Sequence, residues 1–203
     1  CVSISRTANS ENYALPPHVR LPVDLTKTGR TPPARIAVSL GAVRALETEG
    51  GFKLADKAAL LAGHSLGENS ALAAAGTLGI AEGARLLRLR GQAMQRAVPA
   101  GEGGMAALLG VEAEQAQSIC EDAAQGQILE IANDNGGGQI VVSGHMDAVD
   151  RAIALAKERG IKRAVKLPVS APFHSSLMAP AGREMAAALA TATLNTPSVP
   201  VIA

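Results

Sequence analysis

The sequence feature that most restricts the fold is a serine between two glycines, at the junction of two unlike segments. Residues 58–62 (Ala-Ala-Leu-Leu-Ala) form an uncharged run that is too short for a stable helix. Residues 68–75 are rich in alanine and favour a helix. Between them, Gly63-His64-Ser65-Leu66-Gly67 matches the G-x-S-x-G pattern of a sharp turn from a buried strand into a helix. This order predicts an α/β fold.

The same turn predicts a nucleophile. A strained strand-to-helix turn would hold the Ser65 hydroxyl clear of the sheet edge. The backbone N–H of Leu66 would then point to where a tetrahedral oxyanion forms, at the N-terminus of the helix. We therefore expect Ser65 to attack an acyl carbon, with Leu66 as an oxyanion donor.

Composition argues against several other classes of function. The 203 residues contain one Tyr, two Phe and no Trp, and the net charge is +1 without a basic block. Nucleic-acid binding therefore lacks both its stacking platform and its electrostatic footprint. No apolar run approaches the roughly 20 residues that span a bilayer, so we expect no membrane contact. The two cysteines, Cys1 and Cys120, predict neither a metal site nor a disulfide framework, and favour a cytoplasmic setting.

The order of segments predicts two domains. Between residues 105 and 169 strand and helix patterns alternate as β-α-β-β-α-β, which is the ferredoxin-like order. We expect a ferredoxin-like subdomain over residues 101–168, inserted into a hydrolase-like domain with a parallel sheet, formed by residues 34–100 and 169–203. Residues 1–33 are polar, bear several prolines and predict an irregular segment.

A serine nucleophile needs a base, and the chain offers four histidines. His18 lies in the irregular segment and His145 between a strand and a helix of the subdomain, so we expect both to be exposed. His64 adjoins the nucleophile, but its side chain leaves the turn in another direction. His174 follows the strand that returns the chain to the larger domain, which makes it the best candidate for the base.

Three motifs together resemble a known family. They are Gly63-His64-Ser65-Leu66-Gly67-Glu68, then Arg90-Gly91, then Ala171-Pro172-Phe173-His174-Ser175. Arg90 and His174 follow Ser65 by 25 and 109 positions. In sequence and spacing these motifs resemble the malonyl-CoA:acyl-carrier-protein transacylases of bacterial fatty-acid synthesis, from about Ile36 to the end of the chain.

The resemblance implies a mechanism and partners. Arg90 would pair bidentately with the free carboxylate of a malonyl group, although Arg85, Arg88 and Arg96 share its helix and only the family register singles it out. Ser65 would take the malonyl group from coenzyme A, with His174 as base, and pass it to the thiol of an acyl carrier protein. Malonyl-CoA and acyl carrier protein are the implied partners, and no metal or cofactor is implied.

The chain also departs from the family pattern at both ends. Family members start with a strand leading into a Gly-Gln-Gly-Ser-Gln loop, which supplies a second oxyanion donor, and no such string precedes Gly63. They continue beyond the position of Ala203, and the segment that orients the base lies there. Asn69 stands where a tyrosine is common. We therefore expect a chain truncated at both ends, with a non-native origin for residues 1–33 as a hypothesis.

Two alternative functions remain open on the sequence. A serine esterase or thioesterase of the α/β-hydrolase kind shares the G-x-S-x-G pattern, but it would place an acid between the nucleophile and the histidine, where the inserted subdomain lies. The other alternative is an inactive fragment that keeps only a surface for binding the carrier protein.

Overall fold

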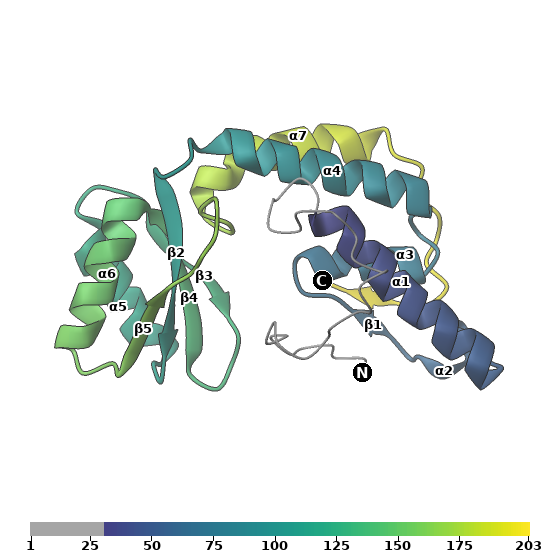
Figure 1. Ribbon diagram of the computed structural model, residues 1–203, viewed down its shortest axis with the longest axis horizontal. Helices are drawn as coiled ribbons and strands as arrows, with labels where there is room; N and C mark the ends of the chain where they lie inside the picture. The colour runs from purple at the N-terminus through teal and green to yellow at the C-terminus, as the bar shows by residue number, and fades with distance from the viewer. Residues whose placement is uncertain (1–30) are drawn as a thin grey trace, which may run out of the picture. The chain divides into compact units, whose positions relative to one another are not determined.

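A computed structural model describes residues 31–203, with side chains described from Arg35 onward. The chain divides into two compact units, Cys1–Arg88 with Ala192–Ala203, and Leu89–Thr191. Each unit combines helices with a small sheet, which confirms the predicted α/β class (Figure 1). Of the segment 1–33 that we predicted to be irregular, residues 1–30 lie outside the described part of the chain, and so does His18.

Helix α1 (Thr31–Gly50) opens the described part of the first unit, three residues before the predicted start at Ala34. Pro32 and Pro33 fall in its first turn, where a missing N–H costs no helical hydrogen bond. Ile36 is 1% exposed and lies over Gly83 of α4 (Ile80–Ala97), where a Cβ would come within 3.3 Å of the Ile36 Cδ1. The lack of a side chain on Gly83 thus leaves room for the Ile36 side chain.

The strand before the serine is shorter and more exposed than predicted. After the short helix α2 (Leu54–Lys57), strand β1 covers only Leu61–Ala62, and the Leu60 side chain is 49% exposed. β1 pairs in parallel with β6 (Val201–Ile202), its only partner in the sheet formed by the described residues. The prediction of a buried strand over residues 58–62 was therefore wrong, because one two-residue partner cannot cover an apolar run of five.

The second unit contains a four-stranded sheet. Its elements follow one another as β2 (Gly103–Leu109), α5 (Ala113–Ala124), β3 (Leu129–Asp134), β4 (Gln139–His145), α6 (Met146–Glu158) and β5 (Arg163–Lys166). The strand order is β3-β4-β2-β5, and every neighbouring pair is antiparallel. A bulge interrupts the β3–β4 register between Ile131 and Asn133.

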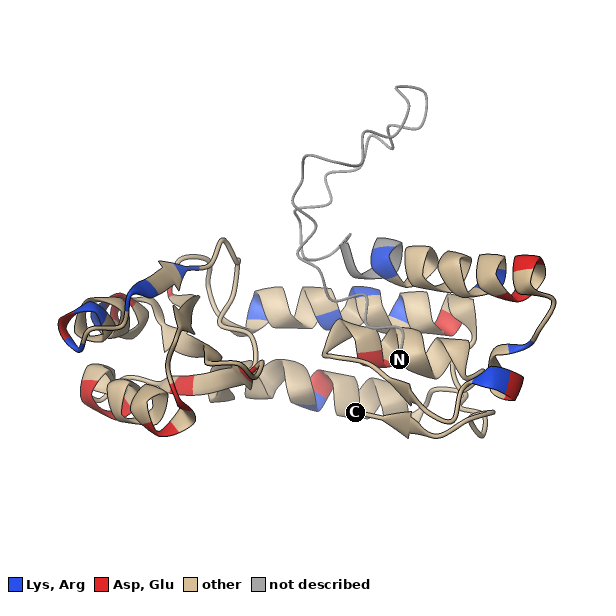
Figure 2. Ribbon diagram, turned by 90° about the horizontal axis from the view of Figure 1, so that it is seen from below, with Lys and Arg blue, Asp and Glu red and all other residues tan. Residues whose placement is uncertain are grey.

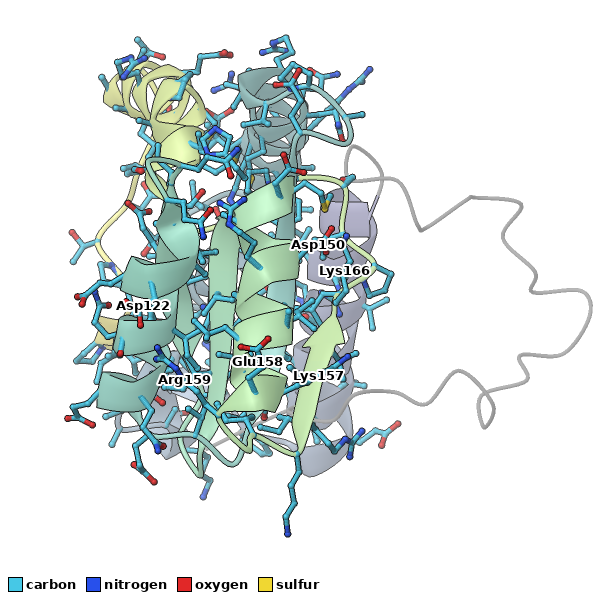
Figure 3. All side chains as sticks on the ribbon, turned by 90° about the vertical axis from the view of Figure 1, so that its left-hand side faces the viewer. Asp122, Asp150, Lys157, Glu158, Arg159 and Lys166 are labelled. Carbon is cyan, nitrogen blue, oxygen red and sulfur yellow. The ribbon has the colours of Figure 1, made fainter. Side chains whose placement is uncertain are left out.

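The two faces of this sheet carry different layers. Helices α5 and α6 lie side by side over one face, as Figure 3 shows, and the largest apolar cluster of the described residues fills the space beneath them. Its most buried members include Leu108, Ile119, Val142 and Val149. The other face holds a smaller cluster in which Met105, Ala107 and Val141 contact Phe173. The segment that carries His174 therefore packs on the face without helices.

Ion pairs tie the helices of the second unit together at its surface. Arg159, just after α6, bonds to Asp122 and, at 3.0 Å, to Ser118 on α5, while Lys166 of β5 bonds to Asp150 of α6 at 2.7 Å (Figure 3). The charged residues of α5 are all acidic (Figure 2), and the basic partners in these pairs are Arg159 and Lys166 of β5. Exposed pairs of this kind contribute little to stability, so the apolar cluster between helices and sheet dominates.

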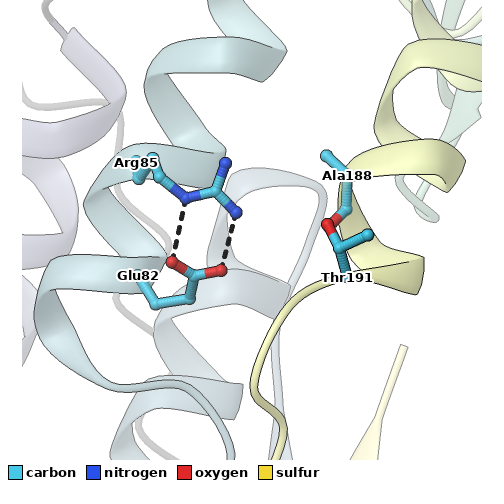
Figure 4. Close-up of polar contacts among 4 residues, drawn as sticks. All are labelled: Glu82, Arg85, Ala188 and Thr191. Carbon is cyan, nitrogen blue, oxygen red and sulfur yellow. Dashed lines mark hydrogen bonds and ion pairs between the residues drawn. The ribbon is translucent and has the colours of Figure 1, made fainter.

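Helix α7 (Ala179–Ala190) was not among the predicted elements. It follows a short 3-10 helix (Ser176–Met178) and has a proline in its first turn. Its buried residue Ala181 belongs to an apolar cluster with Ala93 and Met94 from the C-terminal half of α4. The helix ends at Ala190, and the hydroxyl of the next residue, Thr191, donates to the carbonyl of Ala188 at 3.1 Å (Figure 4).

Cys120, the one cysteine of the described residues, provides a test of how α5 packs on the sheet. Burial raises the pKa of the Cys120 thiol to about 11, and the charges of Glu121 and Glu130 add to the shift. Because the thiolate is the reactive form, iodoacetamide at pH 8 should modify Cys120 in urea but hardly in the native protein. Peptide mapping by mass spectrometry measures this, and rapid native-state labelling would contradict it.

The same thiol makes stability depend on pH. The unfolded chain loses the thiol proton near its ordinary pKa of 9.0, whereas the folded chain keeps it to about 11. The unfolded state thus binds fewer protons than the folded state between pH 9 and 11. The contribution of Cys120 to the free energy of unfolding is therefore fully present below pH 9 and is lost as the pH rises to about 11. Urea titrations of the wild type and Cys120→Ala at several pH values should show this difference.

Candidate active site

Ser65 lies at the junction of β1 and α3 (Leu66–Ala74), in an unusual backbone conformation. Its φ is 54° and its ψ is −105°, outside the regions that residues with a Cβ readily adopt. Among residues 31–203, only Ser65, Gln125 and His174 have a positive φ without being glycine. Gln125 is an ordinary left-handed helix cap. The other two are the predicted nucleophile and the predicted base, and such strain is typical of functional sites.

Gly63 makes the tight turn before Ser65 possible. A Cβ at this position would overlap the carbonyl group of Gly67 and the amide nitrogen of Glu68. The turn is closed by hydrogen bonds from the Gly67 N–H to the His64 carbonyl at 2.9 Å and from the Glu68 N–H to the Ser65 carbonyl at 3.2 Å. A Cβ on Gly67 would meet no described atom within 4 Å. The first glycine of the motif is therefore required sterically, whereas the second has room for a side chain.

Leu66 is the first residue of α3, so its N–H belongs to the turn whose amides have no acceptor within the helix. It also stands at the positive end of the helix dipole. Both features suit an oxyanion donor, and the assignment of Leu66 to that role stays a prediction.

Arg90 differs from the other arginines of α4 in its burial. Arg85, Arg88 and Arg96 are exposed, whereas Arg90 is half-buried. Arg85 donates two hydrogen bonds to Glu82, at 2.9 and 2.7 Å (Figure 4), which hold the pKa of the Glu82 carboxyl below its ordinary value. Arg96 bonds to Glu184 of α7 at 2.6 Å. Burial thus sets Arg90 apart, a property that the sequence of the helix alone does not reveal.

His174 is exposed and has a φ of 60°. Buried residues stand on both sides of it, with Ala171 and Pro172 before it and Ser175 after it. The ring of Pro172 lies against Gly103, where an added Cβ would come within 2.5 Å of the proline Cγ. The loop is therefore anchored while its histidine stays accessible, which the role of base allows.

The other described histidines are less suited to the role of base. His64 is exposed, as its place in the turn predicts. His145 is half-buried rather than exposed, and its Nδ1 accepts a hydrogen bond from the Ile128 N–H at 3.0 Å. Our expectation of a solvent-exposed His145 was wrong, because the ring closes the end of the β3–β4 pair.

The predicted site residues divide between the two units. Ser65 and Leu66 belong to the first unit, and Arg90 and His174 belong to the second. Residues 31–203 contain no group of three or more side chains suited to holding a metal ion. Nor is any helix in this range long and apolar enough to pass through a bilayer.

The strained serine turn and the two further motifs can be compared with known families. A family profile described as "Acyl transferase domain" matches residues 13–203. The chain belongs to the acyl transferase domain family. The match includes residues 13–33, whose origin the sequence left open.

Relatives of this acyl transferase domain agree on one activity. The malonyl CoA-acyl carrier protein transacylase of Escherichia coli K12 is 45% identical over 179 residues, which cover 88% of this chain and 57% of the relative. That of Bacillus subtilis is 42% identical over 180 residues, with 88% and 55% covered. The chain thus spans little more than half the length of these relatives, and the resemblance inferred from the three motifs is confirmed.

Solved structures agree with the same assignment. The acyl-carrier-protein-S-malonyltransferase of Bartonella henselae is 52% identical, with a TM-score of 0.84 over 88% of this chain and 57% of that one. A malonyl-transacylase solved in complex with its type II PKS acyl-carrier protein is 42% identical, with a TM-score of 0.83 over 88% and 56%. The α/β fold of the acyl transferase domain is therefore shared with these proteins.

One group near His174, the predicted base, was missed by the sequence analysis. Glu130 of β3 accepts hydrogen bonds from Ser176, the second residue after His174. A single glutamate in a strand carries no local signal, and its partner lies 46 positions away. Only the folded arrangement brings the two together.

Proposed function

We propose that this domain transfers a malonyl group from coenzyme A to an acyl carrier protein through a Ser65 acyl-enzyme, with His174 as base. The observation that carries the proposal is the backbone strain of Ser65 and His174, at the two motif positions that the chemistry needs. Relatives named for malonyl transfer support the choice of substrate, and the complex of one of them with an acyl-carrier protein supports the choice of partner.

The proposed reaction has two halves. Ser65 Oγ bonds to the thioester carbon of malonyl-CoA while its proton passes to His174, and the Leu66 N–H donates to the oxyanion. The carbon–sulfur bond breaks, and His174 returns the proton to the departing thiol of coenzyme A. In the second half the thiol of the carrier protein attacks the Ser65 ester by the same steps in reverse. The proposal requires Ser65 Oγ within hydrogen-bonding reach of His174.

We further propose the finer architecture predicted from the sequence. The parallel β1–β6 pair and its helices would be part of a hydrolase-like sheet formed by residues 34–100 and 169–203, and residues 101–168 would be an inserted ferredoxin-like subdomain. The β-α-β-β-α-β element order and the antiparallel strand order β3-β4-β2-β5 support the second assignment. A cytoplasmic setting is supported by the buried free thiol of Cys120.

A labelling experiment tests the proposed activity. The chain is incubated with isotope-labelled malonyl-CoA, with acetyl-CoA or with a simple ester, and covalent adducts are located by mass spectrometry. Malonyl labelling of Ser65 that is released by carrier protein supports transfer. Ester turnover without malonyl labelling would favour an esterase or thioesterase, and carrier binding without any adduct would favour an inactive binding fragment.

Arg90 should determine the choice between malonyl and acetyl groups. Arg90→Ala removes a bidentate charge-assisted pair with the malonyl carboxylate, so we expect the ratio of malonyl to acetyl labelling rates to fall about 10²-fold. Arg90→Lys keeps the charge without the fork, and the ratio should fall about tenfold. The matched control is Arg88→Ala, an exposed arginine on the same helix. An unchanged ratio in Arg90→Ala would remove Arg90 from the site.

A further inference from the structure

The loop that carries His174 requires support from its surroundings. A left-handed φ costs a residue with a Cβ roughly 1–2 kcal/mol relative to ordinary backbone, so the loop relaxes unless its neighbours hold it. Before His174, the Pro172 ring packs on Gly103 at the start of β2. After it, the buried Ser175 hydroxyl donates to the Pro172 carbonyl at 2.7 Å and closes the loop around the histidine.

Glu130 holds the far side of this loop. One carboxylate oxygen accepts from the Ser176 backbone N–H at 2.7 Å, and the other accepts from the Ser176 hydroxyl at 2.8 Å. The two bonds fix both the main chain and the side chain of the residue that begins the 3-10 helix. Bonds to an ionised carboxylate are shorter and stronger than neutral ones, and two of them also fix orientation.

Glu130 is itself held in a rigid element. It is half-buried in β3, where it stands opposite Ser143 of β4, whose side chain is fully buried. Two residues along β3, Ala132 packs into the cluster that contacts Phe173, the residue just before His174. Ser143 and Val141, a member of this cluster, alternate on one face of β4, and Glu130 stands opposite Ser143, so Glu130 and the cluster meet the loop from the same side of the sheet.

We infer that Glu130 is a positioning residue, whose two bonds to Ser176 hold His174 where it can take the proton of Ser65. The inference rests on the proposed function for the identity of the base. Glu130 acts through the loop and touches no reacting atom. A base displaced by about 1 Å can slow a reaction about 10²-fold, so the contact matters even though it is remote from the chemistry.

The test measures activation of Ser65 with two reagents. Malonyl-CoA reports the proposed reaction. A fluorophosphonate reports only the serine and its base, because Oγ bonds to phosphorus, the phosphorus–fluorine bond breaks and the hydroxyl proton passes to the base. We expect Glu130→Ala to slow both labelling rates by about 10- to 100-fold. Glu130→Gln keeps one acceptor oxygen, and Ser176→Ala keeps the backbone N–H donor. Both variants should therefore lose less of their labelling rate than Glu130→Ala.

Three controls separate positioning from folding. Asp150→Asn removes an exposed carboxylate of the same unit that bonds to Lys166, and it should label at the wild-type rate. Hydrogen exchange of the Ser176 amide should accelerate in Glu130→Ala while circular dichroism stays unchanged. In a His174→Ala background, Glu130→Ala should cause no further loss, because Glu130 acts only through His174.

The outcomes distinguish the inference from the proposed function. Fluorophosphonate labelling that depends on Glu130, without malonyl labelling, would refute the substrate and keep the inference. Malonyl labelling at the wild-type rate in Glu130→Ala would overturn the inference and keep the function. If Glu130→Ala lowers the labelling rate by the same factor in the wild type and in the His174→Ala background, the inference is also overturned. A wild-type chain that reacts with neither reagent would overturn both.

Discussion

Replacing Ser65 by alanine should lower the rate of covalent labelling by malonyl-CoA by at least about 10⁴-fold. The Ser65 hydroxyl is the only atom that could form the acyl ester in the proposed reaction, and alanine cannot replace it. Alanine also keeps the Cβ, so the strained turn with a φ of 54° should persist and the variant should fold. Intact-protein mass spectrometry at several incubation times measures the adduct.

The matched control is the residue before the nucleophile. His64 is exposed, and its side chain has no role in the proposed reaction. His64→Ala should therefore label at nearly the wild-type rate. If Ser65→Ala labels at the wild-type rate, Ser65 is not the nucleophile; if His64→Ala fails as completely as Ser65→Ala, the division of roles between the two neighbours is wrong.

Gly63→Ala should be the most destabilising small substitution in the first unit. The added Cβ would overlap the Gly67 carbonyl group and the Glu68 amide nitrogen, which are main-chain atoms and cannot rotate away. Relief requires the start of α3 to move, and overpacking of this kind costs about 1–3 kcal/mol in the free energy of unfolding. The same movement displaces Ser65, so labelling by malonyl-CoA should fall along with stability. Urea titration and the labelling rate measure the two effects.

The other glycine of the turn supplies the comparison. A Cβ on Gly67 would meet no described atom within 4 Å, and the residue lies in the first turn of α3. Because alanine favours helix over glycine by up to about 1 kcal/mol, Gly67→Ala should leave stability unchanged or slightly raised. Equal destabilisation by the two substitutions would show that the steric account of Gly63 is wrong.

Much of the fold could be predicted from local patterns. The helix patterns near residues 34–49, 81–98 and 147–158 each correspond to an observed helix, because apolar spacing and glycine or proline stops act locally. The length of β1 could not be predicted in this way. A strand ends where its partner ends, and the two residues of β6 stand about 140 positions further along the chain.

The site was predictable only in part. Two nearby glycines predict the turn at Ser65, so the roles of Ser65 and Leu66 could be predicted from adjacent residues. Arg90 is one of four arginines on its helix. It can be chosen as the substrate-binding arginine only from its burial in the structure or from its spacing to Ser65 in the family. Glu130 has neither. Its role depends on one tertiary contact with Ser176, and a contact between distant positions leaves no trace in a single sequence.

The two positive φ angles have a consequence for how this domain can change over generations. Glycine would relieve the strain at positions 65 and 174, so either substitution should stabilise the fold while removing a group that the chemistry needs. A lineage selected for thermal tolerance alone would drift toward glycine at both positions. If serine and histidine persist at these positions across many descendants, selection for catalysis has continued in spite of the stability that glycine would add.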